Sequence, residues 1–177
     1  LSAHANPLHP DPEIGEAHRA YVTNAILMAE ALGVHTVVTF SGCPGGAPGD
    51  RTPNWVTCPW PNDFSVTLQY QWDDVMLPYW EKTAAFAAER GVRLAIEMHP
   101  GFCVYNPGTL LRLRNAIGPT IGANFDPSHL FWQNVDLTDA IRTLGPTIYH
   151  FHAKDTKIYP INAGRNTLVD VAKTFGP

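Results

Sequence analysis

The stretch GVRLAIEMHPG, at residues 91–101, decides the fold class of this chain. Gly91 ends a helical pattern, an apolar run follows, and the run stops at Glu97, before a loop that contains His99. A short and nearly continuous apolar run is typical of a strand that is buried on both faces, as in a parallel sheet. We therefore expect a buried parallel strand at residues 92–98, with a carboxylate close to its carboxyl end.

The same unit of helix, glycine and apolar strand recurs on both sides of this stretch. Helices are expected at about residues 11–32, 73–90, 106–117 and 136–144, and further strands at residues 35–40, 121–125 and 148–152, while residues 1–3 look like the end of a strand. This alternation predicts an α/β fold, either an open doubly wound sheet or a (β/α) barrel. No glycine-rich phosphate loop follows the first strand, which disfavours the dinucleotide-binding form of the open sheet.

Composition and charge narrow the classes of partner. Hydrophobic residues make up 45% of the 177 residues and the net charge is −4, so we expect no nucleic-acid partner and no membrane partner. No apolar run approaches the roughly 20 residues that cross a bilayer. The three cysteines suit a reducing compartment, and we expect a cytoplasmic protein with a small-molecule partner. Assembly into a homo-oligomer stays open.

Residues 42–71 interrupt the pattern of helices and strands. This segment contains five prolines, two cysteines and several aromatic residues, namely Trp55, Trp60, Phe64 and Tyr70. A long connection without regular structure inside a compact domain is uncommon and often forms a lid or a binding loop. We expect either a βα-loop insertion that acts as a lid or pocket wall, or a surface insertion that packs its own aromatic side chains.

Three strands in succession end in a side chain that can bind a metal ion. Glu97, Asp126 and His152 each lie at or just after the end of an expected strand. The carboxyl ends of parallel strands meet at one edge of a sheet, so these side chains are expected to converge. A site of two carboxylates and an imidazole suits Mn²⁺, Mg²⁺, Co²⁺ or Zn²⁺, and the absence of thiolates argues against structural zinc.

Each of these residues also has an ordinary structural explanation. A single glutamate at a strand end is usually a surface residue, and Asp126 before Pro127 is a candidate helix cap. The occurrence of all three at successive strand ends favours a shared site. For His150, which lies two residues before His152, we expect a hydrogen-bonded core histidine instead of a ligand.

Three runs make the sequence similar to a known family: AIEMHPG at residues 95–101, GANFDPSHL at 122–130 and HFHAKDT at 150–156. They resemble the sugar phosphate isomerase/epimerase superfamily, the xylose-isomerase-like TIM barrels, and the likeness covers essentially the whole chain. The resemblance implies a (β/α)8 TIM barrel, of which residues 1–177 form part of a single domain. A closed barrel of this kind takes about 250 residues, so we expect an incomplete portion covering approximately strands 3 to 7.

The resemblance also implies roles for individual residues. In the ketose 3-epimerase branch, one divalent metal ion is held by a Glu, an Asp, a His and a second Glu, and the first three fall on Glu97, Asp126 and His152. His129 matches the substrate-contacting histidine of the family, and His99 and Lys154 complete the expected substrate-binding set. The fourth ligand has no counterpart, because no Glu follows Asp155, and position 158 is Ile where the family has a substrate-binding Arg.

The implied activity is a metal-dependent isomerase or epimerase of a sugar, keto-sugar or polyol derivative. Proton removal next to a carbonyl gives an enediolate-type intermediate that a divalent cation stabilises, and Glu97 is then both ligand and catalytic acid/base. The alternatives are a keto-sugar lyase or dehydratase on the same barrel and an apurinic-endonuclease-like phosphodiesterase, which needs additional histidine ligands and a basic groove. We expect the 177-residue portion alone to be inactive.

Overall fold

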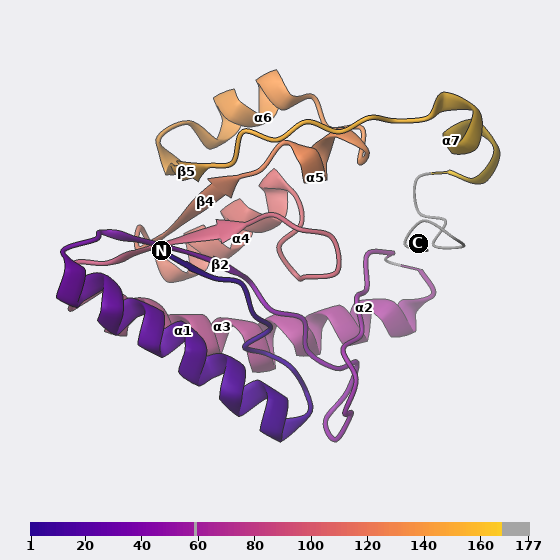
Figure 1. The fold of residues 1–177 in the computed structure, drawn as a ribbon. Helices are drawn as coiled ribbons and strands as arrows, with labels where there is room; N and C mark the ends of the chain where they lie inside the picture. The colour runs from indigo at the N-terminus through magenta and orange to yellow at the C-terminus, as the bar shows by residue number, and fades with distance from the viewer. Residues whose placement is uncertain (59, 168–177) are drawn as a thin grey trace.

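The computed structural model of the protein describes residues 1–58 and 60–167. Five parallel strands form one sheet in the order β1-β2-β3-β4-β5, so each strand lies beside its neighbour in the chain (Figure 1). The strands are β1 (Ser2–Ala3), β2 (Thr36–Phe40), β3 (Arg93–Glu97), β4 (Ile121–Phe125) and β5 (Ile148–Phe151). This order confirms the prediction of a parallel α/β sheet, and it is the order of a barrel rather than that of a doubly wound sheet.

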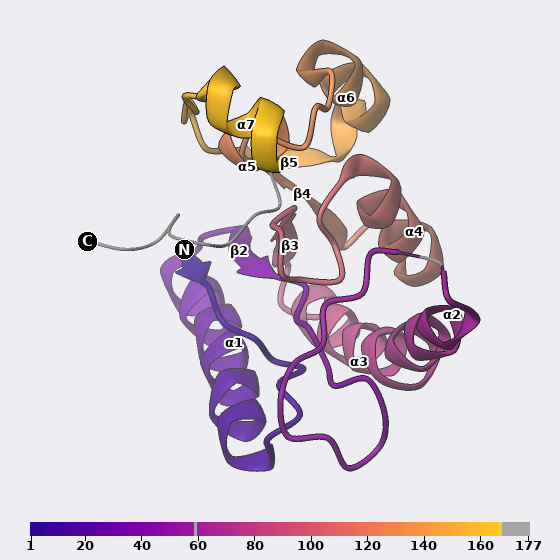
Figure 2. The same cartoon turned by 90° about the vertical axis from the view of Figure 1, so that its right-hand side faces the viewer.

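The helices that connect the strands pack on one side of the sheet, as Figure 2 shows for α1, α3, α4 and α6. The helical segments are α1 (Pro12–Leu32), α2 (Asn62–Gln69), the π-helix η1 (Tyr70–Met76), α3 (Leu77–Ala88), α4 (Pro107–Ile117), α5 (Ser128–Phe131), α6 (Leu137–Leu144), the 3-10 turn η2 (Gly145–Thr147) and α7 (Pro160–Asn166). Within residues 1–58 and 60–167, no helix is long and apolar enough to cross a membrane.

Local sequence signals explain where most helices begin and end. The Asp11 side chain accepts a hydrogen bond from Glu13 N at the start of α1, and Gly33 ends that helix in the left-handed conformation at φ 68°. Asn106 and Thr109 form a capping box at the start of α4. Asp136 caps α6 through the backbone N–H of Asp139. These helix ends agree with the predicted ones to within a residue or two.

The helix expected from about residue 73 begins earlier. Helical structure runs from Asn62 through α2, η1 and α3 to Ala88, so residues 62–71 are not part of an irregular loop. The sequence pattern missed α2 because the helix is short and none of its residues is fully buried; Leu68 is its partly buried contact with the core. Gln71, buried in the π-helix, donates hydrogen bonds to Gly45 O (3.0 Å) and Asn54 O (2.6 Å) and so anchors the irregular part of the insertion.

Residues alternate along each strand between the helix-covered face and the inner face of the sheet. Leu94, Ile96, Ile121 and Phe125 are fully buried in the core cluster between the sheet and the helices. The intervening positions form a row across the inner face, because the register pairs Phe40 with Glu97, Glu97 with Asn124, and Asn124 with His150. The inner carboxyl edge therefore carries the polar residues Glu97, Asn124 and His150, with Phe40 beside them.

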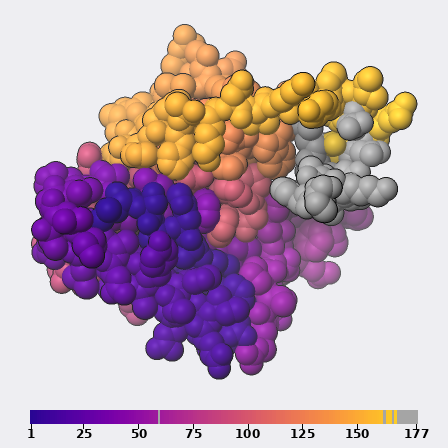
Figure 3. All heavy atoms as spheres, in the orientation of Figure 1, coloured from indigo at the N-terminus to yellow at the C-terminus, as the bar shows by residue number. Residues whose placement is uncertain are grey.

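The sheet curves strongly enough that side chains which follow its two outer strands approach each other at this edge. His4 directly follows β1 and His152 directly follows β5, yet their ring centroids are 6.2 Å apart. In the space-filling view, the indigo N-terminal residues likewise lie against the orange and yellow residues of the β5 region (Figure 3). The described residues thus form a partial barrel, as the length of the chain predicts.

Candidate metal and active site

Glu97 is the centre of a polar cluster at the carboxyl edge of the sheet. It is the last residue of β3, its side chain is 3% exposed, and it lies on the inner face. His129 Nε2 donates to Glu97 Oε1 at 3.0 Å, and His4 Nε2 donates to Glu97 Oε2 at 3.0 Å. Both oxygens of a buried carboxylate are therefore hydrogen-bonded to imidazoles from two other segments of the chain.

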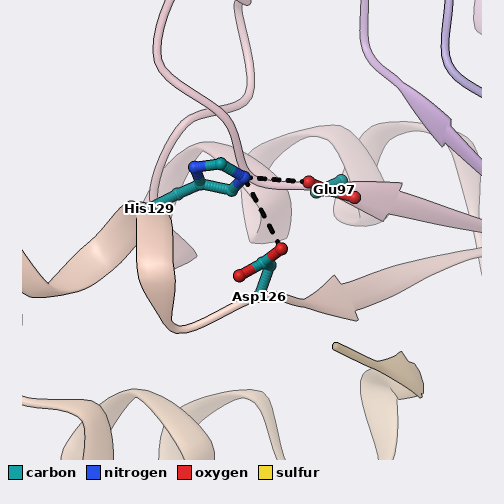
Figure 4. Close-up of side chains that lie close together, drawn as sticks. All are labelled: Glu97, Asp126 and His129. Atoms are coloured by element: carbon teal, nitrogen blue, oxygen red, sulfur yellow. Dashed lines mark hydrogen bonds and ion pairs between the residues drawn. The ribbon is translucent and has the colours of Figure 1, made fainter. Parts of the chain in front are cut away.

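Asp126 follows β4 directly and points its second oxygen into the same cluster (Figure 4). Its Oδ1 accepts hydrogen bonds from Ser128 N (3.0 Å) and Ser128 Oγ (2.6 Å), which fix the orientation of the carboxylate. Its Oδ2 lies 3.6 Å from His129 Nε2 and 2.5 Å from Lys154 Nζ. One oxygen of Asp126 therefore stabilises the turn into α5, which is the structural role expected of a residue before a helix. The other oxygen belongs to the polar cluster.

His152 joins the two carboxylates from the end of β5. Its Nδ1 lies 3.3 Å from Glu97 Oε2 and 3.3 Å from Asp126 Oδ2. The backbone N–H of His152 donates to Phe125 O at 3.0 Å, so the turn after β5 stays attached to β4. The structure thus brings together the three residues that the sequence predicts as metal ligands.

His129 comes as close to the carboxylates as His152 does. Ligand atoms of Glu97, Asp126 and His129 all lie within 4.8 Å of one another, the spacing of donors around one metal ion (Figure 4). The prediction that His129 contacts substrate and His152 binds metal therefore stays a prediction, because both imidazoles reach the site.

His99 and Lys154 also lie at the cluster. The ring of His99 packs against that of His129 with centroids 4.0 Å apart, and its Nδ1 is hydrogen-bonded to Pro100 O. Burial lowers the pKa of His99, which favours a neutral ring. The hydrogen bond to Asp126 raises the pKa of Lys154, which keeps its ammonium charged.

Two residues of the cluster were given no role in the site from the sequence. Asn124 is fully buried and donates from Nδ2 to Glu97 Oε2 (2.7 Å) and His152 Nδ1 (3.1 Å). His4 contacts Glu97 from the end of the first strand. Asn124 lies two residues before Asp126 and so on the same strand face, a signal that was available in the sequence. For His4, the available signal in the sequence was its position as a polar residue directly after the apparent end of a strand.

The prediction of a core position for His150 is wrong. His150 donates from Nδ1 to Asn124 Oδ1 at 2.8 Å, so it is hydrogen-bonded as expected, but its side chain is exposed. The reason is its place on β5, the outer strand of the sheet: no strand in the described part of the chain lies beyond β5 to cover it, whereas Glu97 and Asn124 lie on inner strands.

Hydrogen bonding keeps both carboxylates ionised. Burial acts to raise the pKa of Glu97, but the hydrogen bonds from His129 and His4 outweigh it and hold the pKa well below its ordinary value. For Asp126, burial is likewise outweighed, here by the hydrogen bonds from Lys154 and Ser128, and its pKa is also lowered. Two anionic carboxylates therefore face a common point.

The chemistry of these donors fits a divalent metal ion. Two buried carboxylates of like charge need a cation between them, and the Lys154 ammonium and the imidazoles occupy that position in the structure. Carboxylate oxygens with imidazole nitrogens are ligands that Mn²⁺, Mg²⁺, Co²⁺ and Zn²⁺ accept. Glu97, Asp126, His129 and His152 could hold such an ion.

Aromatic rings border the cluster on the side of β2. Phe40 stacks on Phe102 with centroids 4.3 Å apart, and it also lies 4.6 Å from the ring of His4 and 5.0 Å from that of His99. Phe40 is the inner-face neighbour of Glu97 in the register of the sheet. The polar cluster therefore has an apolar wall on one side.

Comparisons with known proteins agree with this fold. A family model described as xylose isomerase-like TIM barrel matches residues 1–175. The uncharacterized protein YfiH of Bacillus subtilis (strain 168) is 42% identical over 180 residues, which cover 100% of this chain and 57% of the relative. The chain thus spans little more than half the length of this curated relative.

Two solved structures share the fold at lower identity. A D-tagatose 3-epimerase-like protein superposes with a TM-score of 0.61 at 21% identity, over 86% of this chain and 55% of that one. A xylose isomerase-like TIM barrel protein from Mycobacterium smegmatis, in complex with magnesium, superposes with a TM-score of 0.61 at 17% identity. The match covers 86% of this chain and 50% of that one.

Proposed function

Because the chain belongs to the xylose isomerase-like TIM barrel family, we propose that the protein of which it forms part is a divalent-metal-dependent isomerase or epimerase. Its substrate is a sugar, keto-sugar or polyol derivative. The observation that carries the proposal is the convergence of Glu97, Asp126 and His152 at the carboxyl edge of the sheet. The similarity to a D-tagatose 3-epimerase-like protein and to a TIM barrel protein in complex with magnesium supports it.

In this proposal, Glu97, Asp126 and His152 hold one metal ion. The ion supplies Lewis-acid stabilisation for the negative charge that develops when a proton leaves the carbon next to a carbonyl. Glu97, ionised at neutral pH, accepts that proton and returns it. His129, His99 and Lys154 bind and orient the substrate hydroxyl groups. Asn124 and His4 hold the Glu97 carboxylate in place through the hydrogen bonds described above.

The test uses the full-length protein. Metal analysis of protein purified without chelators, followed by titration of Mn²⁺, Mg²⁺, Co²⁺ and Zn²⁺ into metal-free protein, is expected to give about one ion per chain. A panel of keto-sugars, incubated in D₂O with the preferred ion, should then show solvent deuterium next to the carbonyl. Asp126→Ala should abolish both results, whereas Asp139→Ala, a surface change on α6, should preserve both.

The outcomes separate the proposed reaction from its alternatives. Loss of water or carbon–carbon cleavage in the same panel would assign a lyase or dehydratase instead. Metal binding without deuterium exchange or conversion of the sugars would contradict the isomerase proposal, although it would still support the metal site.

A phosphodiesterase is the second candidate, and one observation favours it. That activity needs histidine ligands beyond His152, and the structure brings His4 and His129 to Glu97. The end of β2 offers Ser41 instead of a histidine, and the net charge of −4 does not attract a nucleic-acid backbone. More than one zinc ion per chain, together with cleavage of DNA that contains abasic sites, would establish this function in place of the first.

A further inference from the structure

Cys43 and Cys103 form a pair of buried thiols beside the site. Their side chains are hydrogen-bonded to each other, and the two residues are 1% and 5% exposed. Their backbones are also adjacent, because Cys103 N donates to Gly42 O at 3.0 Å. The remaining cysteine, Cys58, is exposed. This close approach of two backbones that carry neighbouring thiols is the arrangement that a disulfide requires.

The pair joins two loops that carry residues of the site. On one side, Asn6 accepts from Cys43 N (2.8 Å) and donates to Cys43 O (2.9 Å), and it lies two residues after His4. On the other, His99 N donates to Val104 O at 3.1 Å, next to Cys103. A covalent bond between these thiols would therefore tie the loop after β2 to the loop that carries His99.

A small cavity gives an oxidant access to the pair. Its volume is about 120 Å³, and its lining includes Cys103 together with Trp72, Tyr105 and Arg112. A water molecule takes up roughly 30 Å³, so the cavity is large enough for hydrogen peroxide, which is not much bigger than water. Glutathione and other bulky disulfides do not fit such a space.

We propose that Cys43 and Cys103 are a peroxide-oxidation site and form a reversible intramolecular disulfide. The Cys103 sulfur, which borders the cavity, attacks one peroxide oxygen; the O–O bond breaks, and the thiol proton leaves with the departing hydroxide as water. The Cys43 sulfur then attacks the sulfenic acid on Cys103, the S–O bond breaks, and the Cys43 proton leaves as part of a second water. Two thiols lose two electrons in total, and one peroxide gains them.

The mutual hydrogen bond assigns the second step to Cys43. The bond from Cys103 lowers the pKa of Cys43, against the opposing effect of burial, whereas the same bond and burial raise the pKa of Cys103. Cys43 is thus the better thiolate of the pair, and the thiolate is the form that attacks the sulfenic sulfur after the first step has consumed the Cys103 proton. This chemistry is independent of the metal site and of the proposed function.

The experiment uses the reduced full-length protein with Cys58→Ser, so that the exposed thiol does not react, and any cysteine outside residues 1–177 also replaced by serine. After exposure to hydrogen peroxide, peptide mass spectrometry is expected to find a Cys43–Cys103 linked peptide and no free thiol in the pair, and dithiothreitol should restore both thiols. The matched variant with Cys58→Ser and Cys43→Ser should instead trap a sulfenic acid on Cys103 that dimedone labels.

Two results would overturn the proposal. One is a pair of thiols that stays free after peroxide treatment of a protein that circular dichroism shows to be folded. The other is accumulation of sulfinic acid on Cys103 without the linked peptide while Cys43 is present, because it would show that Cys43 does not resolve the sulfenic acid.

Discussion

Replacing Asn124 with leucine tests whether the hydrogen bonds of one buried amide hold the site together. Leucine has nearly the same size, so the change removes three hydrogen bonds and leaves little cavity. Asn124 is 0% exposed, and its amide bonds Glu97 Oε2 at 2.7 Å, His152 Nδ1 at 3.1 Å and His150 Nδ1 at 2.8 Å. The substitution therefore removes a hydrogen bond from each of two proposed metal ligands, Glu97 and His152, and one from the exposed His150.

The expected loss of stability follows from these partners. A hydrogen bond to a charged group contributes roughly 1.5–3 kcal/mol and a neutral one roughly 0.5–1.5 kcal/mol. The exposed His150 turns to water at little cost, and Glu97 Oε2 keeps its hydrogen bond from His4. We therefore expect Asn124→Leu to lower the free energy of unfolding of the metal-free protein by about 2–4 kcal/mol. Because two ligands lose their orientation, metal affinity should fall by roughly 10- to 100-fold.

Urea denaturation of the metal-free full-length protein measures the first effect, and calorimetric titration with Mn²⁺ measures the second. The control is Asn24→Leu, the same substitution at an exposed position of α1, which should change neither quantity by much. A stability loss below about 0.5 kcal/mol, within the range of ordinary surface substitutions, would refute the energetic reasoning. An unchanged Mn²⁺ affinity in a folded variant would refute the positioning role of Asn124.

Three further predictions concern other parts of the chain. His150→Ala, at the exposed end of the inner-face row, should lower the free energy of unfolding by less than about 1 kcal/mol and leave metal affinity unchanged. His152→Ala should instead remove metal binding. The reverse pattern in calorimetric titrations would show that the ligand is His150. Gly122→Ala should destabilise the fold by about 3 kcal/mol or more in thermal unfolding, because the new Cβ would lie 2.5 Å from Thr147 O and 2.3 Å from the Tyr149 ring; a wild-type melting temperature would contradict the close approach of β4 and β5. The lowered pKa of Glu97 should make the metal-free protein lose stability on acidification: a carboxyl group with a pKa depressed below its ordinary 4.5 contributes stability above that value and loses it as pH falls towards the folded pKa. In urea denaturation at pH values from 7 to 3, Glu97→Gln should flatten this dependence, and an equally steep dependence in the variant would place its cause elsewhere.

The sequence alone determined the order of the five strands and of the helices α1, α3, α4 and α6 between them, because the signals involved are local. A glycine at a helix end, an apolar run of five or six residues and a polar residue at its end identify a parallel strand without knowledge of its neighbours. For the same reason, Glu97, Asp126 and His152 could be predicted as a group: their positions at strand ends place them on one edge of any parallel sheet. The helix α2 escaped prediction because it is short and makes only a partly buried contact with the core, through Leu68.

Only the tertiary structure decided how the site is assembled. The curvature of the sheet brings His4 from the first strand to Glu97 on the third, and no local pattern records that curvature. The register places Asn124 between Glu97 and His150, and His150 is exposed because β5 is the outer strand of the sheet among the described residues. Strand ends are specified by the residues next to them in the chain, whereas hydrogen bonds across strands depend on register and curvature, which the packing of the whole sheet sets.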